Sequence, residues 1–264
     1  ATGVVRLLPD DTDGGRLKAW TLLTALESIA GHEETIGTAR PTGEAYSRDF
    51  HGPNWQDRRD IAVAYEDRDP DVLIVGGGQA GISTAARLTQ LGADALIVDS
   101  NDRVGDNWRN RYHALVLHNQ VHVNHFPYLP FPPNWPTYIP KDKLAGWFEA
   151  YVELMELNFW TGTTFSGGTY DDADGRWIAE LTKADGTVRR LRPKHIVMAT
   201  SVSGIPNIPA IPTLDNFEGK VIHSGKYTGS QDRAGTDVLI IGTGTSGHDI
   251  AQDLHSNGAT PTLV

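Results

Sequence analysis

Cysteine is absent from the whole chain of 264 residues. A chain without thiols can form no disulfide, no thiolate metal site, no iron–sulfur cluster and no redox-active Cys-x-x-Cys pair. These classes of chemistry are therefore excluded.

Long apolar runs and an excess of positive charge are also missing. No stretch approaches the roughly 20 apolar residues of a membrane-spanning helix, so we expect no membrane span. The 23 Lys and Arg residues are outnumbered by 33 Asp and Glu residues, which gives a formal net charge of −10. This charge would repel nucleic-acid phosphates, so we expect no DNA or RNA partner. No signal peptide is recognisable, and we expect a cytoplasmic protein.

Glycine, by contrast, is abundant, with 28 residues. Such a content indicates tight turns and places where the backbone approaches a ligand. The chain opens at Ala1 rather than at methionine and closes at Val264 within an apolar run. We therefore expect it to be a piece of a longer protein.

Composition divides the chain into three regions, 1–68, 69–230 and 231–264. In the first, residues 4–8 and 17–26 predict two strands of a hairpin. Residues 42–69 are polar, without a clear period, and we interpret them as a linker.

The second region opens with the pattern of a βαβ unit. A strand at 71–75 is followed by a glycine-rich turn, a helix that ends at Gly92, and a strand at 95–99. Further along, apolar spacing predicts a helix over 141–157, a hairpin turns at Asp185-Gly186, and 196–199 is typical of a buried strand.

The third region repeats this order, with a strand at 237–241, a glycine turn and a helix. The sequence therefore predicts an α/β fold with two Rossmann-like dinucleotide-binding units and a small N-terminal hairpin and linker extension. The two units are an FAD domain over 69–230 and the start of an NADPH domain over 231–264, as the resemblance described below implies.

Each glycine turn has the GxGxxG spacing that is typical of turns that bind a pyrophosphate. In the first, Gly76 makes the turn, Gly78 lets a phosphate approach the backbone, and Gly81 lets the helix pack on the strand. Asp99, at the end of the next strand, can accept hydrogen bonds from ribose hydroxyls. The corresponding residues of the second turn are Gly242, Gly244, Ser246 and Gly247.

Further motifs follow in a recognisable order. They are Gly105-Asp-Asn-Trp108, a strand end at Ala199-Thr200, and the FxGxxxHxxxY string formed by Phe217, Gly219, His223 and Tyr227. Together with the two glycine turns, this order resembles the flavin-containing monooxygenases over residues 71–264. Two positions depart from the family pattern, since Asp99 stands where Glu is more frequent and Ser201 replaces a glycine.

The resemblance implies that FAD binds the first turn and NADPH the second. It implies that Gly105, Trp108 and Thr200 belong to the cofactor-binding set. It also implies that NADPH reduces FAD, and that a flavin hydroperoxide passes oxygen to a soft nucleophile such as an amine nitrogen or a sulfide sulfur. The partners would be molecular oxygen and a small-molecule substrate, and an oligomer is compatible with the sequence.

Two alternatives stay open at this point. A similar fingerprint ending in tryptophan marks Baeyer-Villiger monooxygenases, which insert oxygen beside a ketone, whereas Tyr227 followed by Thr228 favours the branch that oxidises heteroatoms. The chain could also be a non-catalytic FAD-binding fragment. Pyridine-nucleotide disulfide reductases, a third class with paired nucleotide-binding units, are excluded by the absence of cysteine.

Three residues are candidates for catalysis. By the resemblance, Asn119 would lie beside the flavin, although it also suits a plain turn. His223 would position the two nucleotide domains, or simply pack, and Tyr227 belongs to the same string. His118, His122 and His125 lack matching carboxylates or cysteines, so we expect no metal site.

The two ends of the chain and one loop add further expectations. The proline-rich segment 127–140, with interleaved aromatics, suits an ordered loop over a cofactor or a polyproline ligand. Residues 16–24 resemble the last strands of a SnoaL-type α+β domain. The residue that selects NADPH over NADH would lie beyond Val264, so we expect further βα units there and little turnover without them.

Overall fold

The computed structural model describes residues 2–42, 50–202 and 204–264. The helices are α1 (Trp55–Ala64), α2 (Gln79–Gln90), α3 (Asp106–Arg109), α4 (Lys141–Leu154) and α5 (Thr245–Ser256). The strands are β1 (Thr2–Asp10), β2 (Arg16–Ala25), β3 (Val72–Val75), β4 (Ala95–Val98), β5 (Val116–Gln120), β6 (Tyr138–Pro140), β7 (Asn158–Trp160), β8 (Thr163–Asp171), β9 (Arg176–Lys183), β10 (Val188–Leu191), β11 (His195–Met198), β12 (Asp237–Ile240) and β13 (Thr260–Leu263).

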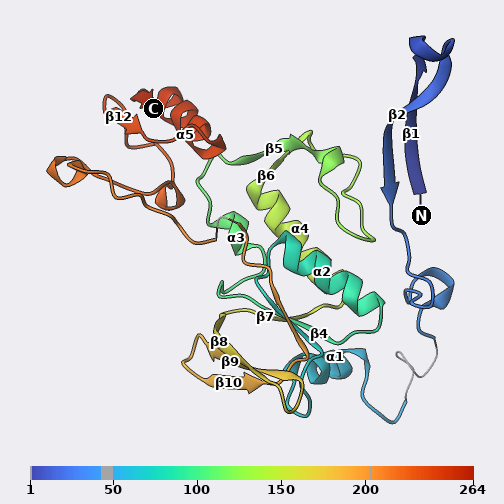
Figure 1. The fold of residues 1–264 in the computed structure, drawn as a ribbon. Helices are drawn as coiled ribbons and strands as arrows, with labels where there is room; N and C mark the ends of the chain where they lie inside the picture. Colours follow the sequence, from blue (N-terminus) through green and yellow to red (C-terminus); the bar gives the residue numbers. More distant parts are fainter. Residues whose placement is uncertain (1, 43–49, 203) are drawn as a thin grey trace.

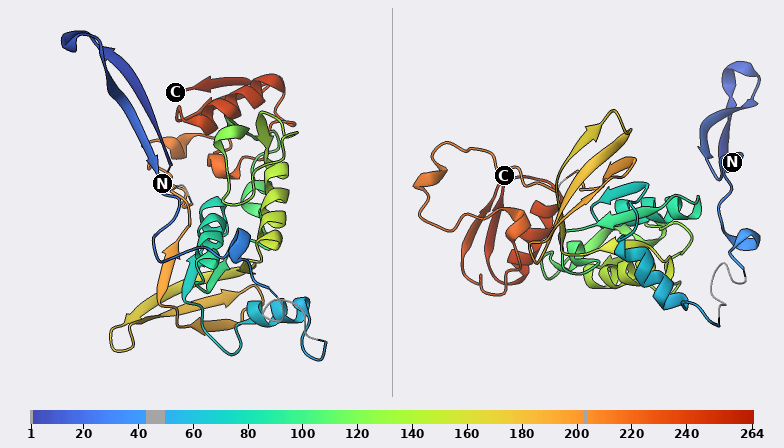
Figure 2. Two further views of the ribbon diagram at one scale, coloured as in Figure 1. Left: turned by 90° about the vertical axis from the view of Figure 1, so that its right-hand side faces the viewer. Right: turned by 90° about the horizontal axis from the view of Figure 1, so that it is seen from below.

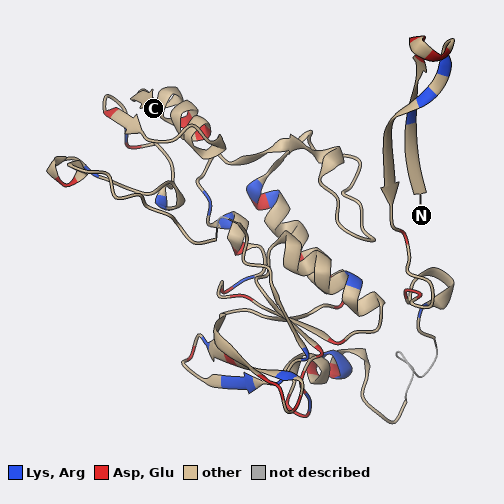
Figure 3. Cartoon of the chain, in the orientation of Figure 1, with Lys and Arg blue, Asp and Glu red and all other residues tan. Residues whose placement is uncertain are grey.

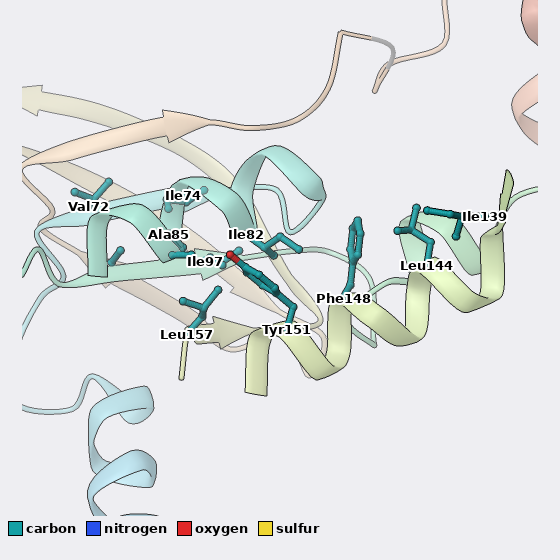
Figure 4. Close-up of a cluster of buried hydrophobic side chains, with 12 residues drawn as sticks. Val72, Ile74, Ile82, Ala85, Ile97, Ile139, Leu144, Phe148, Tyr151 and Leu157 are labelled. Atoms are coloured by element: carbon teal, nitrogen blue, oxygen red, sulfur yellow. The ribbon is translucent and has the colours of Figure 1, made fainter. Parts of the chain in front are cut away.

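A parallel sheet in the order β11-β3-β4-β7 forms the centre of the main body (Figure 1). Its short central strands are apolar on both faces because each face is covered. One face packs on α2 and α4, as Figure 4 shows for Ile74, Ile97, Phe148 and Tyr151. The predicted βαβ unit is thus confirmed, and the amphipathic helix predicted over 141–157 is present but ends at Leu154.

The opposite face of the sheet packs against an antiparallel sheet in the order β10-β9-β8. Leu73 and Leu96 meet Leu181 in this second core, and all three side chains are fully buried. The hairpin predicted at Asp185-Gly186 joins β9 to β10. The strand predicted at 196–199 is β11, which lies at the edge of the parallel sheet and is half-buried rather than buried.

A second βαβ unit lies at the C-terminal end, where β12 and β13 pair in parallel and α5 connects them. Ile240, Ile250, Leu254 and Ala259 form its core. The chain therefore contains two Rossmann-type units, as the sequence predicted.

The N-terminal hairpin of β1 and β2 extends away from the main body in both views of Figure 2. Its side chains are almost all exposed, including Trp20 and Leu22.

The interpretation of residues 42–69 as a linker needs correction. Residues 43–49 lie outside the described part of the chain, but Asn54 and Asp57 form a capping box that starts helix α1. Trp160 donates its indole N–H to the carbonyl of Val63, and Tyr65 is buried in the second core. Residues 54–65 are therefore packed onto the FAD unit.

Acidic and basic side chains are interspersed over most of the fold, although β10 carries only Arg and α5 carries Asp without Lys or Arg (Figure 3). Among the described residues, no helix is long and apolar enough to cross a membrane.

Candidate functional site

The first glycine turn joins β3 to α2 and is built from glycines that fill distinct steric roles. Gly76 has φ of 109°, and a Cβ there would lie 2.5 Å from the carbonyl oxygen of Ala199. A Cβ on Gly81 would lie 1.9 Å from the oxygen of Gly76. Both glycines are therefore required for the turn to pack against its own sheet and helix.

Gly78 is different, because the protein leaves room beside it. It is the N-cap of α2 with extended backbone angles, and an added Cβ would meet only the amide nitrogen of Asn107, at 3.3 Å. The first turn of α2 carries no acidic residue, so its free N–H groups present a partial positive charge. This arrangement leaves room for a phosphate group at the helix N-terminus, and we call it the first cradle.

Asp99 follows β4 and lies beside the same turn. One carboxylate oxygen accepts a hydrogen bond from the backbone N–H of Gly77 at 2.6 Å, and the other accepts from the backbone and side-chain amides of Asn101. The carboxylate is thus fixed at the edge of the cradle, where a ribose would follow a pyrophosphate. Asn101 was not expected from the sequence.

Helix α3, with Gly105 at its N-cap and Trp108 within it, is the third element in this region. Gly105 has φ of 87°, and its missing side chain lets α3 approach the backbone of Ala145 in α4. The indole nitrogen of Trp108 is buried and has no hydrogen-bond partner among the described residues. A buried donor without an acceptor is costly, and a bound ligand oxygen would satisfy it.

Thr200 follows β11 and adjoins the first turn, since a Cβ on Gly76 would lie 3.3 Å from the Thr200 nitrogen. The next residue, Ser201, has φ of 69°. This left-handed conformation favours glycine and explains why the related family has glycine there. The structure thus brings together Gly76, Gly78, Gly81, Asp99 and Thr200, with α3 beside them.

The second glycine turn joins β12 to α5 and has the same construction. Gly242 has φ of 116°, Gly244 is the N-cap of α5 in open space, and a Cβ on Gly247 would lie 2.2 Å from the oxygen of Gly242. Ser246 is exposed in the first helical turn, which contains no acid. The second turn therefore also leaves room at a helix N-terminus, and we call it the second cradle.

The three catalytic candidates occupy three different settings. Asn119 is exposed on β5 rather than in a turn. His223 accepts a hydrogen bond from the N–H of Gly225 through Nδ1 and caps a short 3₁₀ turn. Tyr227 is buried in the core of the second unit and donates its hydroxyl to Asp253 on α5.

Tyr112 is a residue that the sequence reasoning missed. It packs 6.1 Å from the ring of Tyr227 and donates its hydroxyl to Asp249, also on α5. Two acids spaced by four residues on one predicted helix were the available signal, but nothing in the sequence indicated which side chains they would meet.

The proline-rich segment forms an ordered aromatic loop over α4. Phe126 packs on Phe148, and Phe131 stacks on Trp135 with ring centroids 4.8 Å apart. Its aromatic side chains are therefore packed on the protein, unlike those of an extended polyproline ligand. No group of three or more metal-binding side chains occurs within residues 2–42, 50–202 and 204–264.

Comparison with known proteins identifies the family. The model of the flavin-binding monooxygenase-like family matches residues 69–263. The chain is 32% identical over 210 residues to the indole-3-pyruvate monooxygenase YUCCA1 of Oryza sativa subsp. japonica, covering 79% of this chain and 49% of the relative. The chain spans about half the length of the curated relatives it matches.

Solved structures agree with this match. A mutant flavin monooxygenase from Stenotrophomonas maltophilia is 26% identical with a TM-score of 0.67, covering 74% of this chain and 57% of the other. A cyclohexanone monooxygenase is 28% identical with a TM-score of 0.60, covering 74% and 38%. The fold is that of the FAD- and NADPH-binding flavin monooxygenases. The chain belongs to the flavin-binding monooxygenase-like family.

Proposed function

We propose that the protein is an FAD-dependent, NADPH-consuming monooxygenase that transfers oxygen to an amine nitrogen or a sulfide sulfur. The observation that carries the proposal is the first cradle, where Gly78 leaves room at the N-terminus of α2 beside the fixed carboxylate of Asp99. The unpartnered indole N–H of Trp108 adds a donor that a flavin nucleotide would satisfy. The residues present therefore fit FAD.

Each element has a defined task in this proposal. The N-terminus of α2 binds the pyrophosphate of FAD, and Asp99 accepts hydrogen bonds from its ribose. The N-terminus of α5, with Gly244 and Ser246, binds the pyrophosphate of NADPH. When bound, FAD supplies the electron transfer and oxygen activation, so the protein needs no acid–base triad.

The aromatic loop over α4 has a protective task in the same proposal. Phe131, Trp135 and Trp147 form a packed apolar surface. Exclusion of water matters because a reactive oxygen species exposed to water is lost as hydrogen peroxide before it oxidises substrate. His223 and Tyr227 are proposed to affect this coupling rather than FAD affinity, and Asn119 is proposed to lie beside the flavin.

A carbonyl substrate is the second candidate. It is favoured by two of the similar proteins, an indole-3-pyruvate monooxygenase and a cyclohexanone monooxygenase, since both are named for carbonyl compounds. The heteroatom branch is favoured by Tyr227 and Thr228 at the end of the FxGxxxHxxxY string.

The test measures NADPH consumption by the full-length protein with trimethylamine, a thioether, a ketone or an α-keto acid. Oxygenated product and hydrogen peroxide are quantified for each compound. We expect an N-oxide or sulfoxide in proportion to NADPH consumed. An ester or a decarboxylated acid would establish the carbonyl branch instead, and FAD binding without product from any compound would favour a non-catalytic flavin-binding module.

A further inference from the structure

Two tyrosines hold the same helix from outside its own unit. Tyr112 and Tyr227 are each 8% exposed, and their hydroxyls donate to Asp249 and Asp253, respectively. The two acids lie one turn apart on α5. Both tyrosines precede β12, so neither belongs to the β12–α5–β13 unit that they contact.

The tyrosines lie on two different segments of the FAD unit, one between α3 and β5 and the other on the stretch between β11 and β12 that leads into the second unit. Tyr112 follows α3, and Tyr227 follows the 3₁₀ turn capped by His223. The two segments are joined where the N–H of His113 donates to the carbonyl of Thr228 at 2.9 Å. Ser230, fully buried, donates its hydroxyl to the backbone carbonyl of Asp253 at 2.9 Å. Both tyrosine-bearing segments are thus hydrogen-bonded to α5.

We propose that Tyr112 and Tyr227 are positioning residues that orient α5, and so direct its N-terminus and the bound nicotinamide nucleotide toward FAD. This inference rests on the proposed function. Ile250 and Leu254 fix the packing of α5 inside its own unit. Its orientation relative to the FAD unit depends instead on contacts that cross between the units, and the tyrosine hydroxyls supply two of them.

The charges on α5 give the tyrosines a second effect. The helix carries Asp249 and Asp253 but no Lys or Arg (Figure 3). Without hydrogen-bond donors, these two carboxylates would repel an approaching anionic dinucleotide. The tyrosine hydroxyls hold them against the tyrosine-bearing segments. Burial and the bond to Asp253 raise the pKa of Tyr227 to about 12, so its hydroxyl stays protonated and donates at neutral pH.

The test compares Tyr112→Phe, Tyr227→Phe and the double variant with Tyr65→Phe as a matched control. Tyr65 is also buried and donates to an aspartate, Asp94, but in the second core, which contains no residue of α5. The first readout is amide hydrogen exchange of the FAD-loaded, NADPH-free protein. We expect roughly tenfold faster exchange in α5 and in both tyrosine-bearing segments for the first three variants, and no change there for Tyr65→Phe.

The second readout is steady-state kinetics of the full-length protein. We expect the KM for NADPH to rise about tenfold and the peroxide fraction to increase, with FAD content unchanged. Unchanged α5 exchange and NADPH KM in the double variant, with FAD bound and NADPH oxidised, would overturn the inference alone. Absence of FAD from the wild-type protein would overturn the proposed function instead.

Discussion

At the scale of single residues, the glycines of the two turns are required for different reasons. Gly76 and Gly81 are required by the protein itself, because a Cβ on either would overlap backbone atoms. Gly244 has open space around it, and a Cβ on Gly78 would displace only the side-chain amide of Asn107 slightly, so the two missing side chains matter mainly where a ligand approaches. The GxGxxG spacing predicted all these positions, but only the structure separates the folding requirement from the binding requirement.

This separation can be measured with Gly78→Ala. Because alanine can adopt the backbone angles of Gly78, we expect the melting temperature of the FAD-free protein to change little. The added methyl group occupies the place of the pyrophosphate, so FAD affinity should fall tenfold or more. Gly244→Ala is the control that should leave FAD affinity unchanged. Wild-type FAD affinity in Gly78→Ala would contradict the assignment of the first cradle.

Ser201 offers a test of backbone strain. Its φ of 69° is unfavourable for a residue with a Cβ, so Ser201→Gly should raise the free energy of unfolding by about 1 kcal/mol. Chemical denaturation provides the measurement. Ser224→Gly, in a 3₁₀ turn, should instead be neutral or destabilising. A loss of stability in Ser201→Gly would show that the serine side chain contributes more than the strain costs.

At the scale of elements, the sequence predicted those whose patterns are strong and missed those held by specific contacts. The strands β3 and β4 are apolar throughout, and α4 has a clear apolar face formed by Leu144, Phe148 and Tyr151. Helix α1 was missed because it has no buried side chain of its own and its apolar residues do not repeat along one face. Hydrogen bonds to residues far along the chain hold α1 in place. One example is the bond that the indole of Trp55 donates to Glu156, and no local sequence pattern reveals such a bond.

A similar set of contacts fastens the N-terminal extension to the FAD unit. The carboxylate of Glu34 accepts hydrogen bonds from Tyr128 at 2.6 Å and from Arg87 at 2.9 Å. These bonds, with that from Tyr128 contributing most, hold the pKa of Glu34 below its usual range. The segment is thus attached both to α2 and to the proline-rich loop.

Glu34→Gln should therefore loosen this attachment. We expect a loss of about 1 kcal/mol in the free energy of unfolding, limited by the solvent exposure of Arg87, and faster proteolysis of residues 26–42. Glu33→Gln, whose carboxylate accepts only the local N–H of Gly31 among the hydrogen bonds described, is the matched control. Equal cleavage rates in the two variants would show that Glu34 does not hold the segment.

At the scale of the whole molecule, the two nucleotide units and the N-terminal hairpin were predictable because each is encoded locally. Their mutual placement was not, since it depends on pairs such as Tyr112 and Asp249 that are far apart in the sequence. The cofactor cradles were predicted as sets of residues, whereas the substrate pocket has no motif. The exposed hairpin has apolar side chains on both strands, but the structure places it apart from the FAD unit.

The most direct test of the account is to identify and quantify the flavin released from the purified protein by denaturation. A pyrophosphate cradle next to a ribose-binding carboxylate is suited to a dinucleotide, so the released flavin should be FAD, present in stoichiometric amount. FMN lacks both the pyrophosphate and the adenosine that these groups would bind. Release of FMN, or failure of the purified protein to retain or take up FAD, would contradict the central claim.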